Sequence, residues 1–404
     1  MSEPLVVIGN GMAAARLVDE IARRALGRYA VAVIGEEPRL AYNRVLLSSL
    51  LADEIAAADV ELRPARWWRD RGVTLRYGAP AVAVDLGTRT VTLADGTALG
   101  FSKAVFATGS RPIRLGLPGM ELPGVMTFRD IGDVDAIRAR AAAGTRVVVI
   151  GGGLLGLEAA HGLAKAGARV VLVHLMDRLM ERQLDDVAAA MLRRAVEARG
   201  VEVILAAETA RIVGSQRVEA VELRDGRSLP ADLIVMAVGI RPNAELAVAA
   251  GLRVNRGIVV DDGLATSAEG VFAIGECAEH RGQCYGLVEP AYEQAAVLAR
   301  RLAGGAARYP GTVLATNLKV SGVDVFSAGD FLGQPGAEQI VLHDPGLGVY
   351  RKFVIAQDRL IGAVLYGDTS DALWYLDLIR AGRPIGSFRD DLAFGRAIVD
   401  RAAA

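Results

Sequence analysis

Two segments of the chain repeat one pattern, in which a short strand-forming run leads into a glycine-rich turn and an alanine-rich helix. Residues 5–15 read LVVIGNGMAAA and residues 146–156 read RVVVIGGGLLG. A second apolar strand is expected after each helix, at residues 29–35 and 168–174. Each repeat is therefore a βαβ unit with a right-handed crossover. The repeat predicts an α/β chain that contains two nucleotide-binding domains.

The first turn reads Gly9-x-Gly11-x-x-Ala14. In dinucleotide-binding folds the first glycine makes the tight turn, the second lets the backbone approach a pyrophosphate, and the third small residue lets the helix pack on the strand. The phosphate then lies at the helix N-terminus, where free N–H groups favour an anion. Glu36 and Glu37 follow the next strand, where a carboxylate can accept hydrogen bonds from an adenosine ribose. The alternative is a helix–strand contact that needs only small residues.

The second turn, Gly151-x-Gly153-x-x-Gly156, is a complete fingerprint, but the residue at the end of its second strand is His174. An acid at that position would favour NAD through the ribose 2′-hydroxyl, and His174 has no strong preference. Arg178 could bind a 2′-phosphate, or it could be a solvated surface residue. The turn predicts a nicotinamide nucleotide, and the choice between NADH and NADPH stays open.

Composition excludes several classes of protein. With 46 Lys and Arg against 47 Asp and Glu, the chain is not expected to bind nucleic acid. Two Cys are too few for a disulfide scaffold, a four-Cys metal site or a self-contained iron–sulfur centre. No metal ligands are expected among the site residues. The first residues lead directly into an expected strand, with no basic region or separate apolar region before it, so no signal peptide is expected. No run of 18 or more apolar, charge-free residues is present, so no membrane span is expected either. We expect a soluble, cytoplasmic protein.

The C-terminal region has a different pattern. After an expected helix at residues 290–302, strand-like runs at residues 323–328, 340–343, 350–355 and 360–366 predict an antiparallel α+β module. A helix near residues 371–380 contains Trp374, Tyr375 and Arg380, and has Leu373, Leu376 and Ile379 on one face. It either packs on its own module or offers a docking surface for an electron acceptor.

Further motifs follow in a characteristic order: Ala107-Thr108-Gly109, residues 238–243 (VGIRPN), Thr266, and residues 271–276 (VFAIGE). With the two fingerprints, they resemble FAD-dependent pyridine-nucleotide reductases of the glutathione-reductase structural class over residues 5–305. The resemblance implies two Rossmann-like dinucleotide-binding domains, one for FAD and one for NAD(P)H, plus a small α+β C-terminal domain. The implied boundaries are 1–118 with 245–308 for FAD, 119–244 for NAD(P)H, and 309–404 for the C-terminal interface domain.

A narrower resemblance covers nearly the whole chain. Residues 8–12, 35–45, 151–160, 273–278, 322–325 and 362–371 are similar to the flavin part of the bacterial assimilatory NAD(P)H nitrite reductase large subunit and to the electron-transfer subunit of assimilatory nitrate reductase. Glu276 agrees with that family, whereas the wider class mostly has Asp there. His174 departs from the expected acid, and the chain ends where the family continues into iron–sulfur and sirohaem regions.

The resemblance also implies site residues. Glu276 would hold the ribityl chain of FAD, and Glu158, expected on the first turn of its helix, would approach the nicotinamide. Pro290 fits the first position of a helix whose dipole would favour reduced flavin. The implied FAD residues are Gly9, Gly11, Met12, Ala13, Ala14, Glu36, Glu37, Arg44, Ser48, Val82, Ala107, Thr108, Gly109, Arg129, Gly275, Glu276, Glu289, Pro290, Ala291 and Lys319. The implied NAD(P)H residues are Gly151, Gly153, Leu154, Leu155, Gly156, His174, Arg178, Val238 and Gly239.

Residues 42–49 contain no Cys, so the redox disulfide that disulfide reductases carry there is not expected, and Cys277 and Cys284 are expected to be ordinary buried residues. The flavin should then pass electrons from NADH, or less favourably NADPH, to a separate partner. The implied partner is an iron–sulfur and molybdenum nitrate reductase catalytic subunit, or a nitrite reductase. A ferredoxin or rubredoxin reductase, and a flavin-bound redox sensor with little turnover, are the alternatives.

Overall fold

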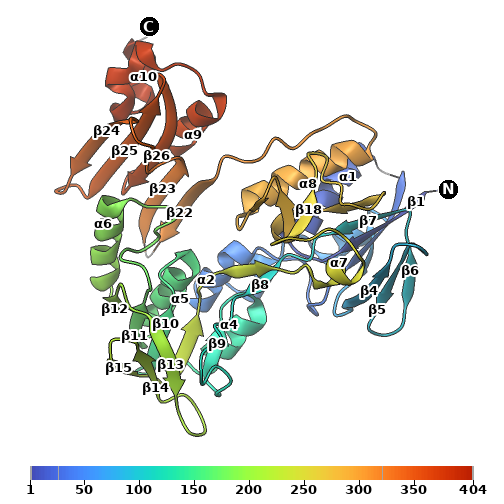
Figure 1. Cartoon of the computed structure of the whole chain (residues 1–404), viewed down its shortest axis with the longest axis horizontal. Helices are drawn as coiled ribbons and strands as arrows, with labels where there is room; N and C mark the ends of the chain where they lie inside the picture. The colour runs from blue at the N-terminus through green and yellow to red at the C-terminus, as the bar shows by residue number, and fades with distance from the viewer. Residues whose placement is uncertain (1, 26, 321, 403–404) are drawn as a thin grey trace. The chain divides into compact units, whose positions relative to one another are not determined.

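The computed structural model describes residues 2–25, 27–320 and 322–402, and it divides into two compact units (Figure 1). Unit 1 comprises Met1–Leu50, Ile55–Ile113 and Ile240–Thr312. Unit 2 comprises Leu51–Glu54, Arg114–Gly239 and Val313–Ala404. Each unit contains one of the two predicted glycine-rich turns.

Unit 1 is built on a five-stranded parallel sheet with the order β19-β7-β1-β2-β3. Its strands are β1 (Glu3–Ile8), β2 (Tyr29–Ile34), β3 (Thr74–Arg76), β7 (Lys103–Phe106) and β19 (Val271–Ala273). Val7 pairs with Val33 on one side and with Val105 on the other, and all three are fully buried. Burial on both faces explains why these strands read as continuous apolar runs. Helices α1 (Met12–Arg24) and α8 (Val288–Leu302) pack side by side (Figure 1).

Smaller elements complete unit 1. Two short strands, β8 and β17, pair antiparallel. Two three-stranded sheets have the orders β4-β5-β6 and β18-β20-β21. The bounds are β4 (Ala81–Asp85), β5 (Thr90–Leu93), β6 (Ala98–Gly100), β8 (Ser110–Pro112), β17 (Ile240–Pro242), β18 (Ile258–Val260), β20 (Ala278–His280) and β21 (Gln283–Cys284). The short helices are η1 (Arg44–Leu46), α2 (Leu47–Leu51), η2 (Ala57–Val60), α3 (Ala65–Arg69), α7 (Glu245–Ala249) and η3 (Gly275–Cys277).

Unit 2 repeats the parallel architecture with the strand order β12-β11-β10-β16-β9. The strands are β9 (Val125–Thr127), β10 (Arg146–Ile150), β11 (Arg169–Val173), β12 (Val201–Ile204) and β16 (Leu233–Met236). Helices α4 (Ile131–Arg138), α5 (Leu154–Lys165) and α6 (Asp186–Glu197) accompany them. A three-stranded antiparallel sheet is formed by β13 (Thr209–Val213), β14 (Ala220–Leu223) and β15 (Ser228–Pro230).

The C-terminal part of unit 2 is a five-stranded antiparallel sheet with the order β22-β23-β26-β25-β24. Its strands are β22 (Ala315–Val320), β23 (Val323–Gly329), β24 (Glu338–Asp344), β25 (Val349–Ala356) and β26 (Arg359–Tyr366). Helix α9 (Ala372–Ala381) lies against this sheet, followed by η4 (Gly386–Phe394) and α10 (Arg396–Ala402). Phe326, Phe353 and Tyr375 are fully buried in its core.

The predicted fold class is confirmed, and three local predictions need correction. Helix α8 begins at Val288, so Pro290 is its third residue rather than its first. Pro290 still lies in the first helical turn, where N–H groups have no partner within the helix. Its lack of an N–H therefore removes no hydrogen bond from the helix. Glu158 is the fifth residue of α5 and starts the second turn, not the first. On α9, Leu376 is buried and Ile379 packs on the core, but Leu373 is 67% exposed.

Candidate functional site

The first glycine-rich turn of unit 1 combines one crowded glycine and one open glycine. Gly9 has φ +117°, and a Cβ there would lie 2.1 Å from the carbonyl oxygen of Ala107, so only glycine fits. Gly11 caps α1 without any side-chain hydrogen bond, and a Cβ there would meet no described atom within 4 Å. No acid lies in the first turn of α1, where Met12, Ala13 and Ala14 follow Gly11. Uncapped N–H groups that face open space are suited to bind a phosphate.

Three distant segments meet beside this turn. Gly275, with φ +80°, follows β19, and a Cβ on it would lie 3.1 Å from the Cβ of Ala13 and 3.9 Å from that of Ala291. Its N–H donates to Oε1 of the fully buried Gln294 at 2.7 Å, which joins β19 to α8. The hydroxyl of Ser110 donates to Oε2 of Glu276 at 2.7 Å. The structure thus brings together residues predicted from three parts of the sequence.

The two acids after β2 differ in their surroundings. Glu36 is exposed, whereas Glu37 accepts a hydrogen bond of 2.7 Å from the hydroxyl of Tyr42 and forms an ion pair with Arg44. The guanidinium of Arg44 lies 4.9 Å from the ring centroid of Tyr42. Burial alone would lower the pKa of Arg44, but Tyr42, Glu37 and Glu276 together raise it. Glu37 is therefore anchored, and Glu36 keeps its carboxylate toward solvent.

The segments after β7 and before α7 are hydrogen-bonded to each other. The hydroxyl of Thr108 donates to the carbonyl oxygen of Asn243 at 2.6 Å, and Asn243 Nδ2 donates to the carbonyl oxygen of Thr108 at 2.9 Å. Asn243 N–H also donates to the carbonyl oxygen of Gly109. Arg111 Nη1 donates to Glu245 at 2.7 Å and holds the pKa of that carboxyl at about 2. The two motifs that end in Gly109 and Asn243 are therefore bonded to each other next to the paired strands β8 and β17.

The second glycine-rich turn, in unit 2, has the same design. A Cβ on Gly151 would lie 2.3 Å from the carbonyl oxygen of Ala237, and a Cβ on Gly156 would lie 1.8 Å from that of Gly151. Gly153 caps α5 without a side-chain hydrogen bond, and a Cβ there would meet no described atom within 4 Å. Leu154 and Leu155 begin the helix and are partly exposed. Val238 and Gly239 follow β16, the strand that pairs with β10.

The residues after β11 are more tightly arranged than the sequence indicated. His174 is buried, and both of its ring nitrogens have partners. Nδ1 accepts from the Gly152 N–H at 3.0 Å, and Nε2 lies 3.1 Å from Oε2 of Glu181. Arg178 Nη1 lies 3.2 Å from Asp186 and 3.5 Å from Asp177. Sequence reasoning missed Glu181, because it is seven residues beyond His174 and only the fold brings it back to the turn.

The remaining predicted FAD residues are on other elements of the two units. Ser48 is in α2, and Val82 on β4 is 56% exposed. Glu289 is in the first turn of α8. Arg129 belongs to unit 2, where its N–H donates to Asp133 at 2.7 Å. Lys319 is in β22, but its side chain lies outside the described residues.

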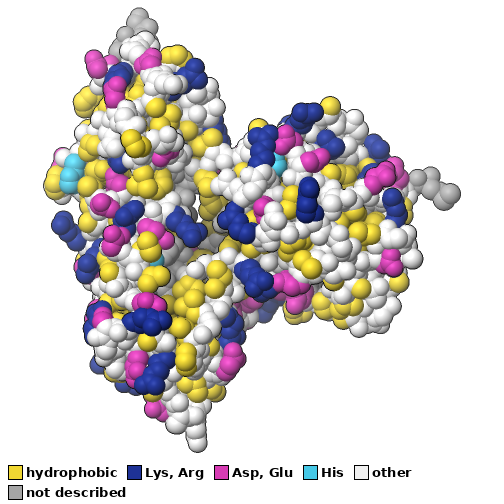
Figure 2. Space-filling model, viewed as in Figure 1, with side chains coloured by type: hydrophobic (Ala, Val, Ile, Leu, Met, Phe, Trp, Pro, Cys, Tyr) yellow, Lys and Arg dark blue, Asp and Glu magenta, His cyan; other side chains and the backbone are white. Residues whose placement is uncertain are grey.

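The surface and the cysteines give further information. Figure 2 shows Lys and Arg side chains interspersed with Asp and Glu over the visible face. Cys277 and Cys284 are free thiols; Cys277 is fully buried, which raises its pKa, and Cys284 is partly exposed. In the part of the chain that the structure describes, no three or more His, Cys, Asp or Glu side chains come together in a group that could hold a metal ion. None of the described helices has the length and apolarity that a membrane crossing requires.

These two glycine-rich sites fit dinucleotides. Each presents an uncapped helix N-terminus, open space at its second glycine and a close backbone contact at its first. A pyrophosphate needs all three features. In unit 1, the carboxylate of Glu276 also lies at the carboxyl end of the sheet, where it can accept hydrogen bonds.

Comparisons with known proteins agree with this geometry. The family model described as pyridine nucleotide-disulphide oxidoreductase matches residues 3–297, and the one described as rubredoxin NAD+ reductase C-terminal domain matches residues 315–383. A nitrite reductase [NAD(P)H] of Bacillus subtilis (strain 168) is 44% identical over 368 residues, which cover 91% of this chain and 46% of that protein.

Two further comparisons cover nearly the whole chain. An assimilatory nitrate reductase electron transfer subunit, also of Bacillus subtilis (strain 168), is 40% identical over 382 residues, which cover 94% of this chain and 50% of that protein. The chain thus spans about half the length of these two relatives. The solved covalent putidaredoxin reductase–putidaredoxin complex matches with a TM-score of 0.89 and 26% identity, covering 99% of this chain and 98% of that chain. Because the first family model matches more than half of the sequence, the chain belongs to the pyridine nucleotide-disulphide oxidoreductase family.

Proposed function

We propose that the chain is an FAD-dependent NAD(P)H oxidoreductase that passes electrons to a metal-containing partner of nitrate or nitrite assimilation. The observation that carries this proposal is the pair of uncapped, glycine-rich helix N-termini, one in each parallel sheet. Two such sites in one chain provide for two dinucleotides. NAD(P)H is proposed as the electron donor because the Bacillus subtilis relative is named as a nitrite reductase [NAD(P)H].

Unit 1 would hold FAD. The N–H groups that follow Gly11 would bind the pyrophosphate, and Glu36 or Glu37 would accept hydrogen bonds from the adenosine ribose. Glu276, oriented by Ser110, would accept hydrogen bonds from the ribityl chain. The N-terminus of α8 lies beside Gly275, because Ala291 of α8 is in contact with that glycine. The dipole of α8 would favour negative charge on the flavin. When bound, FAD supplies the redox chemistry, because it accepts two electrons at once and releases them singly.

Unit 2 would hold the nicotinamide coenzyme. The N–H groups after Gly153 would bind its pyrophosphate, and Gly151 and Gly156 keep the turn and the helix close to the sheet. Glu158, one turn into α5, would lie on the nicotinamide side of that helix. Arg129 and Lys319 remain proposed FAD residues on the resemblance alone.

The proposed partner follows from the relatives. Both curated relatives are named for nitrite or nitrate reduction, and one is named as an electron transfer subunit. We propose a nitrate reductase catalytic subunit with iron–sulfur and molybdenum centres, or a nitrite reductase, as the acceptor. A ferredoxin or rubredoxin reductase is the second candidate, and the match of residues 315–383 to a rubredoxin NAD+ reductase domain favours it.

Anaerobic rapid mixing tests the proposal. The chain is loaded with FAD and mixed first with NADH or NADPH, then with one acceptor: a nitrate reductase catalytic subunit, a nitrite reductase, a ferredoxin or a rubredoxin. We expect fast bleaching of the flavin absorbance by NADH and reoxidation by the nitrate or nitrite reductase. Reoxidation only by ferredoxin or rubredoxin would select the second candidate. No bleaching by either nucleotide would contradict an oxidoreductase and favour a redox sensor.

A further inference from the structure

His174, the residue directly after β11, links the glycine-rich turn to Glu181. Its Nδ1 accepts a hydrogen bond from the Gly152 N–H at 3.0 Å, so the ring proton is on Nε2. Nε2 therefore donates to Oε2 of Glu181 across 3.1 Å. Because both ring nitrogens already have partners, His174 itself is not available to form a hydrogen bond with a ribose.

The carboxylate of Glu181 is held in place by His174 but can still accept further hydrogen bonds. Its side chain is 24% exposed, and only Oε2 bonds to His174. Among the described residues, the cation beside Oε1 is Arg182. Its Nε is 3.9 Å away, beyond hydrogen-bond distance, and its side chain is 87% exposed. An ionised carboxylate oxygen accepts about two hydrogen bonds, so Oε1 can still accept from a ligand.

The fold returns Glu181 to the position where a strand-end acid would act. The imidazole packs directly against the turn, since a Cβ on Gly152 would lie 2.7 Å from Cγ of His174. The N–H of Met180, the residue before Glu181, donates to the carbonyl oxygen of Gly152 at 3.0 Å. In βαβ nucleotide-binding units, the adenosine ribose lies between the first turn and the end of the second strand. Gly152, His174 and Glu181 line this place.

We propose that Glu181, positioned by His174, accepts a hydrogen bond from the adenosine ribose 2′-hydroxyl and makes the site selective for NADH. The inference rests on the proposed function of unit 2 as the coenzyme site. A carboxylate there repels a 2′-phosphate. The cation that could offset this, Arg178, already lies between Asp177 and Asp186 (3.5 and 3.2 Å).

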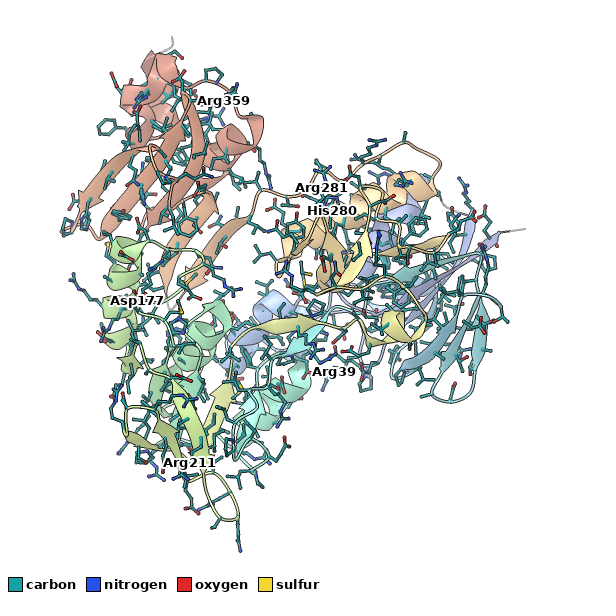
Figure 3. All side chains as sticks on the ribbon, in the orientation of Figure 1. Arg39, Asp177, Arg211, His280, Arg281 and Arg359 are labelled. Atoms are coloured by element: carbon teal, nitrogen blue, oxygen red, sulfur yellow. The ribbon has the colours of Figure 1, made fainter. Side chains whose placement is uncertain are left out.

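The test uses ligands without a nicotinamide, so that it does not depend on turnover. Titration calorimetry measures the affinity of the FAD-loaded chain for ADP-ribose and for 2′-phospho-ADP-ribose. The variant is Glu181→Gln, which keeps the size of the side chain. The matched control is Glu222→Gln on β14, which makes the same chemical change at a carboxylate that pairs with Arg211 (labelled in Figure 3) and has no contact with His174 in the described structure. Glu181→Asp, which keeps the charge, guards against a loss caused by altered packing.

We expect the wild-type chain to bind ADP-ribose more tightly, and Glu181→Gln to reduce this preference roughly tenfold or more, as for the loss of a hydrogen bond to a charged group. Glu222→Gln should change it by less than about threefold, and Glu181→Asp should retain part of it. An unchanged preference in Glu181→Gln, or an equal change in Glu222→Gln, overturns the role of Glu181 and leaves the proposed coenzyme site standing. Absence of binding of either ligand to the wild-type chain contradicts the coenzyme site itself.

Discussion

The buried carboxylate of Asp185 accepts a hydrogen bond of 2.6 Å from the hydroxyl of Tyr350, and this contact joins the N-terminus of α6 to strand β25. Oδ1 of the same carboxylate caps α6 by accepting from the Ala188 N–H at 3.1 Å. Lys352, two residues along β25 and almost fully buried, places its Nζ 3.4 Å from Oδ2. Burial, and then Asp185, raise the pKa of Tyr350. One residue thus connects the parallel sheet of unit 2 to the C-terminal sheet.

We predict that this connection is a main source of stability in unit 2. Tyr350→Phe should lower the free energy of unfolding by about 1.5–3 kcal/mol, because it removes a buried hydrogen bond to a charged acceptor. Asp185→Asn should cost about 3–5 kcal/mol, because it leaves Lys352 buried without its counter-charge. Urea unfolding measures both. Tyr375→Phe, which removes a buried bond to the neutral carbonyl of Leu392 inside the C-terminal module, is the control and should cost about 1 kcal/mol. Equal costs for the two tyrosine variants would contradict the role of Asp185.

Flavin retention should depend on Glu276 and, less strongly, on Ser110. Glu276→Ala should weaken FAD binding by about 1.5–3 kcal/mol, or roughly 10- to 100-fold, by loss of a charge-assisted hydrogen bond. Ser110→Ala keeps the charge but removes the bond that orients Glu276, so a loss below tenfold is expected. Fluorescence titration of the apoprotein with FAD measures both. Glu269→Ala, which removes an exposed carboxylate of unit 1, should not change the affinity. If Glu276→Ala binds FAD as the wild type does, the assignment is wrong.

The Arg111–Glu245 pair predicts a pH dependence of stability. Arg111 lowers the pKa of Glu245 from 4.5 to about 2, so the pair stabilises the fold above pH 4.5 and this contribution disappears as the pH falls toward 2. Because the Glu245 side chain is 57% exposed, the effect should stay below about 1 kcal/mol. Urea unfolding of the wild type and Glu245→Gln should differ at pH 7, and the difference should shrink below pH 4.5 and vanish as the pH reaches about 2. A difference that does not change with pH would refute this origin.

Gly9 and Gly11 should respond differently to alanine although they are two residues apart. Gly9→Ala forces a Cβ to 2.1 Å from a backbone oxygen at a positive φ, and should destabilise unit 1 by at least about 2 kcal/mol. Gly11→Ala meets no described atom and should leave the thermal unfolding midpoint nearly unchanged. Differential scanning calorimetry of the two apoproteins distinguishes them. Equal midpoints would show that the turn is not as crowded at Gly9 as we describe.

Much of the fold could be predicted from the sequence, because the determining signals are local. Glycine turns after buried strands at residues 5–15 and 146–156 locate both parallel sheets, and four alternating runs after residue 322 locate the antiparallel sheet. The family prediction is confirmed by a family model over residues 3–297. Helix boundaries were less certain: α8 begins two residues before Pro290, since several residues can occupy the first turn of a helix.

The sites were harder to predict where their contacts are long-range. Fingerprint residues such as Gly9 and Gly153 are read directly from spacing, and Gly275 is brought beside Ala13 as the motif order implies. The hydrogen bonds of His174 with Gly152 and with Glu181 have no sequence signature, because they depend on how the connection after β11 folds back. The same holds for Asp185 and Tyr350, which are 165 residues apart.

The most direct test of the two-dinucleotide account is a comparison of FAD content and ADP-ribose affinity in Gly11→Ala and Gly153→Ala. Both positions cap a helix in open space, so a Cβ should obstruct only a bound pyrophosphate. We predict that Gly11→Ala lowers the affinity for FAD at least tenfold and keeps ADP-ribose binding, whereas Gly153→Ala keeps FAD and loses ADP-ribose binding. If both variants bind both ligands as the wild type does, the glycine-rich turns are not the dinucleotide sites.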